Sequence, residues 1–258
     1  MQESSSTIVL QGISLRVVRR GAGPPLLLLH GGDGPQDHLP FFNSLAERFD
    51  VIAPVHPGFG GSTIPEQFDG MDDLVYLYLD LLDALDLHDV VLLGFSMGGW
   101  AAAELAVRNT SRLSQLILVD AVGIKPGERE TRDITDIFGL PGAEVARVLF
   151  HDPSRAPNPG SMTDEQLTVL ASDRIAHAVY TWDPYMHNPK LRYRLHRIDV
   201  PTLLIWGESD RMVTVAYAEA YRALIPDARL VVIPEAGHLP QLERPDLFVE
   251  HVWSFAAR

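Results

Sequence analysis

A serine between two glycines, at the point where an apolar run gives way to a helical pattern, is the strongest constraint in this sequence. The segment Gly94-Phe95-Ser96-Met97-Gly98 follows the apolar residues 90–93 and precedes the helical pattern of residues 100–106. A sharp turn from a strand into a helix leaves little room for side chains, and the two glycines relieve that crowding. The turn exposes the hydroxyl group and places the next backbone N–H near a helix N-terminus, where it can face an anion. The pattern predicts a nucleophilic serine of a hydrolase or acyl-transfer enzyme; a flexible turn is the alternative.

Apolar runs alternate with helical patterns along most of the chain. Residues 7–10 and 13–18 predict a hairpin, and buried strands follow at residues 25–29, 51–53, 90–93, 115–119, 202–206 and 229–233. Helices are predicted between them, at residues 71–85, 216–224 and 246–257. This alternation is typical of an α/β protein with a largely parallel sheet and helices on both faces.

One long insert interrupts the alternation. About 80 residues separate Val119 from the strand that starts at Thr202, whereas a single crossover helix needs far fewer. We predict that residues 122–195 form a helical cap over the carboxyl ends of the strands, and that residues 1–121 and 196–258 form the core domain. We expect Tyr180, Trp182 and Tyr185, within this insert, to line a substrate pocket. A surface excursion without a role is the alternative.

Composition excludes several classes of function. The formal net charge of −13 argues against nucleic acids and anionic membranes as partners, because both select a cationic surface. The chain contains no cysteine, which excludes disulfides, thiolate nucleophiles and cysteine-bound metals. No basic segment followed by an apolar one is visible at the N-terminus, so we expect no signal peptide and a cytoplasmic location. The oligomeric state is left open, a homo-oligomer included.

A serine hydroxyl needs a base within hydrogen-bonding reach, and that base needs an orienting acid. Position selects His238, just after the last predicted strand, and Asp210, just after the strand before it. The chain order serine, aspartate, histidine is the one expected when a nucleophile turn comes first. Asp120 also follows a predicted strand and is an alternative acid, although its position is more typical of an ordinary cap at a strand end. Glu208, two residues before Asp210, is less favourably oriented.

The other histidines have structural interpretations. We expect His56 to be partly buried in a turn and His30 to orient the loop that follows it. His151, His177, His187 and His196, scattered through the region of the insert and its end, are interpreted as surface or packing residues. No histidine cluster has the spacing of a metal site, and no cofactor is predicted.

At these positions the chain resembles the α/β-hydrolase superfamily over nearly its whole length. The residues that carry the resemblance are His30-Gly31-Gly32, Gly94 to Gly99, Trp206-Gly207-Glu208-Ser209-Asp210 and Gly237-His238. The resemblance implies an eight-stranded, mostly parallel sheet with helices on both faces and a helical cap inserted after the sixth strand. It also implies Ser96 as nucleophile, His238 as general base and acid, Asp210 as its orienting acid, and an oxyanion hole formed by the backbone N–H groups of Gly32 and Met97.

The nucleophile narrows the reaction further. Relatives that open epoxides or displace halide have aspartate at this turn, whereas this chain has Ser96. It is similar to small capped esterases, lactonases and carbon–carbon hydrolases of ring-fission products, but lacks the asparagine before the serine and the tryptophan after the histidine of the last group, with Phe95 and Leu239 instead. We therefore expect cleavage of a carboxylic ester or lactone of a small, largely apolar substrate, through an acyl-enzyme at Ser96. A carbon–carbon hydrolase of vinylogous diketones and a non-catalytic small-molecule receptor are the alternatives.

Overall fold

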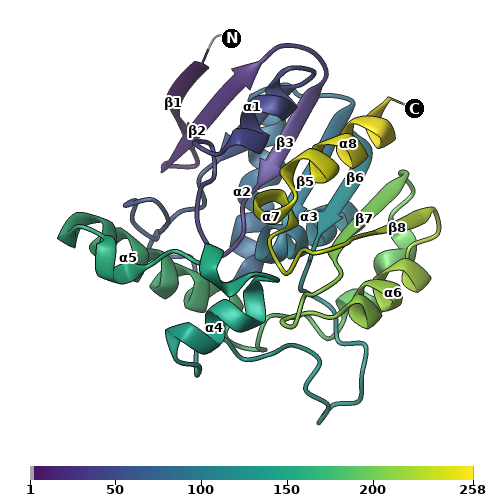
Figure 1. Cartoon of the computed structure of the whole chain (residues 1–258). Coiled ribbons are helices and arrows are strands. Elements are labelled where there is room, and N and C mark those ends of the chain that lie inside the picture. Colours follow the sequence, from purple (N-terminus) through teal and green to yellow (C-terminus); the bar gives the residue numbers. More distant parts are fainter. Residues whose placement is uncertain (1–2, 258) are drawn as a thin grey trace.

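A single sheet organises the molecule. The computed structural model describes residues 3–257, and within them eight strands pair in the order β1-β2-β4-β3-β5-β6-β7-β8 (Figure 1). The strands are β1 (Glu3–Leu10), β2 (Ile13–Gly21), β3 (Pro25–Leu29), β4 (Asp50–Pro54), β5 (Val90–Phe95), β6 (Leu113–Val119), β7 (Thr202–Gly207) and β8 (Ala228–Ile233). Strand β2 is antiparallel to both β1 and β4, and all the other neighbouring strands are parallel. The predicted mostly parallel, eight-stranded sheet is thereby confirmed.

Helices cover both faces of the sheet because its central strands are apolar on both sides. In β3, Leu27 and Leu29 pack into one hydrophobic cluster and Leu26 and Leu28 into the other. Burying each such leucine stabilises the fold by about 2 kcal/mol. The first cluster is covered by α2 (Met71–Ala84), α3 (Ser96–Arg108) and α6 (Val215–Leu224), and the second by α1 (Pro40–Ala46) and α8 (Pro245–Ala256).

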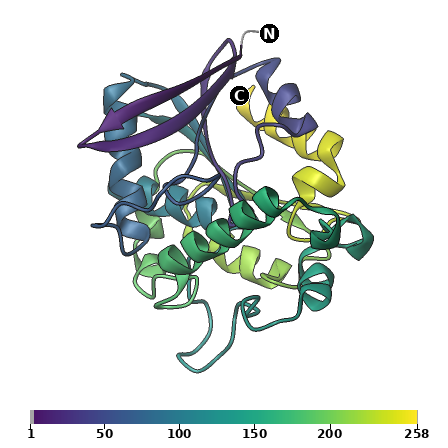
Figure 2. The same ribbon diagram turned by 90° about the vertical axis from the view of Figure 1, so that its left-hand side faces the viewer.

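The segment between β6 and β7 lies at one end of the sheet. It contains α4 (Gly142–Leu149) and α5 (Asp164–Thr181), which Figure 1 shows below the strands and Figure 2 shows from the side, with α5 crossing in front. Its four short 3-10 helices are η1 (Pro153–Arg155), η2 (Pro159–Ser161), η3 (Leu191–Tyr193) and η4 (Leu195–Arg197). The backbone N–H of His238, in the loop after β8, donates to the carbonyl oxygen of Leu149 in α4 at 2.7 Å. The segment therefore contacts the loops that follow the strands.

Local sequence signals explain where the helices begin. A capping box starts α5: the Thr163 hydroxyl accepts from the Gln166 backbone, and the Gln166 side chain accepts from the Thr163 backbone. Helix α3 begins at Ser96 itself, four residues before the helical pattern that predicted it. A last short helix, α7 (Pro240–Glu243), precedes α8. No helix among residues 3–257 combines the length and the apolar composition that crossing a lipid bilayer requires.

Candidate active site

Ser96 stands at the junction of β5 and α3 in a strained backbone conformation. Its φ angle is 48°, in the left-handed region, which costs a residue with a side chain on the order of 1 kcal/mol. The space around it admits only glycine at the two flanking positions. A Cβ atom on Gly94 would stand 2.3 Å from the carbonyl oxygen of Gly98, and one on Gly98 would stand 2.3 Å from that of Leu29. The predicted crowding is therefore present, and the backbone N–H of Met97 lies in the first turn of α3.

Ser96, His238 and Asp210 form a hydrogen-bonded chain. Nε2 of His238 lies 2.9 Å from Oγ of Ser96, and Nδ1 of His238 lies 2.8 Å from Oδ2 of Asp210. All three residues are buried. When Asp210 accepts the hydrogen bond from Nδ1–H, the lone pair of Nε2 faces the serine hydroxyl. A histidine held in this tautomer can remove the hydroxyl proton.

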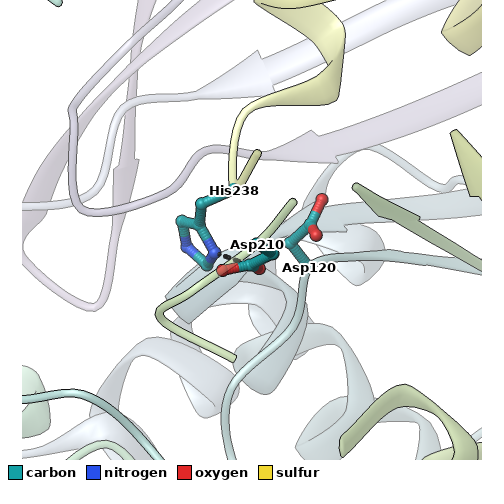
Figure 3. Close-up of side chains that lie close together, drawn as sticks. All are labelled: Asp120, Asp210 and His238. Atoms are coloured by element: carbon teal, nitrogen blue, oxygen red, sulfur yellow. Dashed lines mark hydrogen bonds and ion pairs between the residues drawn. The ribbon is translucent and has the colours of Figure 1, made fainter. Parts of the chain in front are cut away.

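Asp210, and not Asp120, is the acid that contacts the histidine. Oδ1 of Asp210 accepts from the backbone N–H groups of Met212 (2.8 Å) and Val213 (3.0 Å), which fixes the carboxylate plane. Asp120, at the end of β6, instead accepts on Oδ1 from the N–H of Gly207 at 2.9 Å. Figure 3 shows the ring of His238 turned toward Asp210, with the hydrogen bond between them.

Glu243 joins the histidine loop to the end of α4. Its buried carboxylate accepts from the N–H groups of Gly237 (2.7 Å), His151 (3.0 Å) and Asp152 (2.9 Å). A carboxylate with three N–H donors is well satisfied in a buried site. The sequence does not predict this role, because nothing in the pattern Pro-Gln-Leu-Glu distinguishes Glu243 from a solvated helical glutamate.

Two buried histidines hold the loop after β3. Nε2 of His30 accepts from the backbone N–H of His56 at 3.0 Å, and the ring of His56 donates from Nε2 to the carbonyl oxygen of His30 at 2.8 Å. Nδ1 of His56 pairs with the Tyr78 hydroxyl. Burial lowers the pKa of His56 to about 4 and that of His30 well below its usual range, so both rings are neutral. His56 is fully buried, not partly buried as expected, and His30 is placed as predicted to orient its own loop.

Helix α5 covers that loop through His177. A Cβ atom on Gly32 would stand 2.2 Å from Nδ1 and 2.6 Å from Nε2 of the His177 ring, so only glycine fits at position 32. Burial lowers the pKa of His177 to about 3, and the buried Nε2 has no hydrogen-bond partner among residues 3–257. Its interpretation as a surface or packing residue was incomplete, because His177 also lines the cavity described next.

A small cavity opens onto Ser96. Its volume is about 170 Å³, and it contains Ser96, His238 and Gly32. Most of its wall is apolar. The apolar residues come from the segment between β6 and β7 and from positions next to Ser96, Asp210 and His238: Phe95, Ile137, Phe138, Val145, Leu149, Leu170, Met212 and Leu239. The polar residues Asp33, Arg174 and His177 complete the wall. Pockets that bind small molecules are commonly about 300 Å³ or larger, so this one fits a compact, largely apolar group.

The three aromatic residues expected to line the pocket do not lie on this cavity wall. Tyr180 is buried and donates from its hydroxyl to the carbonyl oxygen of Pro57 at 2.9 Å. Trp182 is exposed, and Tyr185 donates to the carbonyl oxygen of Thr135 at 3.2 Å. That part of the prediction is corrected: Tyr180 lies in the last turn of α5, and Trp182 and Tyr185 follow this helix. The rings of Trp182 and Tyr185 contact Phe138, a residue of the cavity wall, but are not themselves part of that wall.

The remaining candidates lie outside the hydrogen-bonded chain. Glu208 is exposed, and His151 is also exposed, with Nδ1 2.8 Å from Oγ of Ser209. Among residues 3–257, one group of acids and histidine has ligand atoms close enough for a metal ion: Asp120, Asp210 and His238. Because His238 is already hydrogen-bonded to Asp210 through Nδ1 and to Ser96 through Nε2, this arrangement suits proton transfer better than metal binding.

The chain as a whole is similar to known hydrolases. The model of the alpha/beta hydrolase family matches residues 26–251. An uncharacterised protein of Mycobacterium tuberculosis is 29% identical, covering 91% of this chain and 76% of the relative. The 2-hydroxy-6-oxo-6-(2'-aminophenyl)hexa-2,4-dienoic acid hydrolase of Metapseudomonas resinovorans is 26% identical, covering 96% of this chain and 89% of the relative. The crystal structure of a bacterial membrane phospholipase A superposes with a TM-score of 0.82 and 25% identity, covering 99% of this chain and 86% of that one.

Proposed function

The chain belongs to the α/β-hydrolase family, and from this premise we propose that it is a serine hydrolase of small, largely apolar carboxylic esters or lactones. The observation that carries the proposal is the hydrogen-bonded chain from Ser96 through His238 to Asp210 at the base of an apolar cavity. In this proposal the three residues form a catalytic triad.

The reaction proceeds in two halves. His238 removes the hydroxyl proton of Ser96 while Oγ attacks the carbonyl carbon, and the carbonyl π electrons move to its oxygen. The tetrahedral intermediate collapses, His238 delivers the proton to the departing alkoxide, and an acyl-enzyme remains on Ser96. Water, deprotonated by His238, then attacks the carbonyl carbon of the acyl-enzyme. The second tetrahedral intermediate collapses, the bond to Oγ breaks, His238 returns the proton to Ser96, and the acid is released. Asp210 stabilises the imidazolium that forms in each half.

Backbone donors stabilise the oxyanion in this proposal. The N–H of Met97 lies at the N-terminus of α3, and the N–H of Gly32 belongs to the loop that His30 and His56 hold. Each fixed N–H donor that faces the developing negative charge typically stabilises the transition state by about 3 kcal/mol. The segment of residues 122–195 acts as the cap, because α4 and α5 supply much of the cavity wall and the His177 ring that covers Gly32.

Cavity size and chemistry set the substrate class. An apolar wall and a volume of about 170 Å³ favour a short acyl chain or a compact lactone over a long chain. The similarity to a phospholipase A fits cleavage of a carboxylic ester. The net charge of −13 further favours neutral substrates over strongly anionic ones.

Carbon–carbon hydrolysis is the second candidate. It is favoured by the similarity to the dienoic acid hydrolase, which extends over 96% of this chain. Phe95 and Leu239 both line the cavity, at the positions where the sequence departs from that group. A ring-fission dienoate offered beside a matched ester separates the two: faster turnover of the dienoate would make carbon–carbon cleavage the principal activity.

Hydrolysis of p-nitrophenyl acetate and butyrate tests the proposal. We expect turnover, and we expect a fluorophosphonate probe to add one adduct that peptide mass mapping locates on Ser96. Ser96→Ala loses the adduct and lowers kcat between about 10⁴- and 10⁶-fold, as triad removal does elsewhere. A folded protein with no turnover of any ester, lactone or dienoate and no adduct would instead be a receptor. Retention of more than a tenth of the activity in Ser96→Ala would remove the serine from the mechanism.

A further inference from the structure

One buried acid beside the site has no part in the reaction just described. Asp120 is completely buried at the end of β6. Its own backbone N–H donates to the carbonyl oxygen of Ile205 at 3.0 Å, and its φ angle of 43° places it in the left-handed region. Strand β7 thus fixes both its backbone and its Oδ1 atom, which accepts from the N–H of Gly207. A left-handed backbone and a buried carboxyl group both cost free energy, so other interactions of Asp120 are expected to offset that cost.

The second carboxyl oxygen of Asp120 is the anomaly. Oδ2 is buried, and it has no hydrogen-bond partner among residues 3–257 when both acids are counted as ionised. The side chain of Asp210 lies next to that of Asp120, and one carboxylate oxygen of each acid and one ring nitrogen of His238 all lie within 4.8 Å of one another. Figure 3 shows these three side chains close together. Two ionised carboxylates are acceptors only, so they cannot satisfy each other in a buried site. A single proton between them removes both the repulsion and the unpaired atom.

The distribution of donors decides which of the two acids holds that proton. Asp210 already accepts three N–H groups, from Met212, Val213 and His238. Asp120 accepts one, from Gly207, and no salt bridge links it to a cation in the described part of the chain. Burial first, and the negative charge of Asp210 second, raise the pKa of Asp120 well above its usual range.

We propose that Asp120 carries a proton on Oδ2 and donates a hydrogen bond to the carboxylate of Asp210, so that it acts as a positioning residue for the Asp210–His238 pair. Asp210 is then held by four donors rather than three and stays in line with the histidine ring. The neutral state of Asp120 also leaves a single negative charge beside His238 when the ring takes up its proton. This inference rests on the proposed role of Asp210 as the orienting acid.

Asp120→Asn tests the protonation state without relying on turnover. Asparagine copies a protonated aspartate: its oxygen accepts from Gly207 and its NH₂ group donates to Asp210. Because no charge is lost, we expect the midpoint of the His238 ring titration, followed by NMR on the resting protein, to move by less than about 0.3 pH unit. If Asp120 were ionised, removing a negative charge less than 4.8 Å away would lower that midpoint by more than about one unit, which would overturn the proposal.

Two further measurements test the hydrogen bond itself. The wild-type protein should show an infrared C=O band of a buried carboxylic acid at neutral pH that is absent from Asp120→Asn; no such difference would contradict the proposal. Asp120→Leu keeps the shape but removes the donor, and it should lower kcat between about 10- and 100-fold, whereas Asp120→Asn stays within about threefold of the wild type. Equal kcat values for folded Leu and Asn variants would remove the positioning role, and if Asp120→Leu does not fold, the titration and the infrared band decide.

Failure of this inference differs from failure of the proposed function. The titration and the infrared band are read from the resting protein and require no substrate. Absence of turnover in the wild type would therefore reject the hydrolase and leave these two results standing, whereas a shifted His238 midpoint in an active Asp120→Asn variant would reject only the proton on Asp120.

Discussion

The ring of His177 lies over Gly32, so closely that a Cβ atom on Gly32 would stand 2.2 Å from it. Helix α5 and the loop after β3 therefore constrain each other at the proposed oxyanion hole. Gly32→Ala forces one of them to move, and we expect kcat/KM for p-nitrophenyl acetate to fall about 100-fold, as the loss of one oxyanion donor does. Steady-state kinetics on purified, folded variants measures this.

The double variant Gly32→Ala/His177→Ala identifies the cause. Removing the ring relieves the contact, so we expect it to recover at least part of the loss. Gly142→Ala is the matched control, because a Cβ atom there meets no atom within 4 Å. A double variant no better than Gly32→Ala would show that the contact does not limit catalysis.

Filling the cavity should change the preference for acyl length. Val145 lines the cavity from α4, whereas Val169 on α5 is exposed and lies outside it. Val145→Phe should lower kcat/KM for a p-nitrophenyl hexanoate relative to the acetate between about 10- and 100-fold, the range of a single hydrophobic contact. Val169→Phe, the same change on the surface, should leave the ratio unchanged. A hexanoate-to-acetate ratio that both variants leave intact would place acyl binding elsewhere.

Stability should fall as the pH drops below neutrality, because of the buried neutral histidines. The pKa of His56 is about 4 in the folded state, against about 6.5 in an unfolded chain, so the unfolded state takes up the proton first. Neutral His56 contributes on the order of 3 kcal/mol to the free energy of unfolding. This contribution is complete above pH 6.5 and is lost progressively as the pH falls toward 4. Urea unfolding at several pH values between 7.5 and 4.5 measures the slope.

Two variants test whether His56 causes the pH dependence of the unfolding free energy. His56→Gln removes the titrating group, so its unfolding free energy should depend less steeply on pH, whatever its absolute stability. His88→Gln, at an exposed site, should keep the wild-type slope. Identical slopes in the three proteins would mean that His56 does not contribute to the acid sensitivity.

Glu243→Gln tests the link between the histidine loop and α4. Glutamine has one acceptor oxygen for three N–H donors, so at least one of these N–H groups loses its partner, at a cost of about 1–3 kcal/mol of unfolding free energy. Because Gly237 precedes His238, we also expect kcat to fall between about 10- and 100-fold. Glu250→Gln on the exposed face of α8 is the control for both measurements. An active, stable Glu243→Gln protein would make the link dispensable.

Periodicity predicted most of the fold because the sheet is buried on both faces. A strand such as β3 has to be apolar at every position, and its predicted bounds, residues 25–29, agree with the structure. The helix predicted over residues 71–85 corresponds to α2, Met71–Ala84, whose buried side chains recur at helical spacing. Ser96, Asp210 and His238 were found because each follows a strand, and parallel strands bring such positions to the same edge.

The cavity wall was not predictable in the same way. Spacing shows that α5 buries one side, but not which neighbour each residue on that side meets. His177 contacts Gly32, while Tyr180, three residues later, bonds to Pro57. The role of Glu243 depends on donors from residues about 90 positions away along the chain, and no local pattern records such a contact.

The bonds at the end of α4 have a consequence for engineering. Arg211 donates to the carbonyl oxygens of Arg147 and Phe150, and the backbone N–H of His238 donates to that of Leu149. The loops that carry Asp210 and His238 are therefore both hydrogen-bonded to the backbone of residues 147–150. A chimaera that imports the whole stretch between β6 and β7 from a relative would replace these atoms together with the substrate-facing wall. Grafts intended to change selectivity alone should therefore retain residues 147–152 and exchange the chain on either side of them.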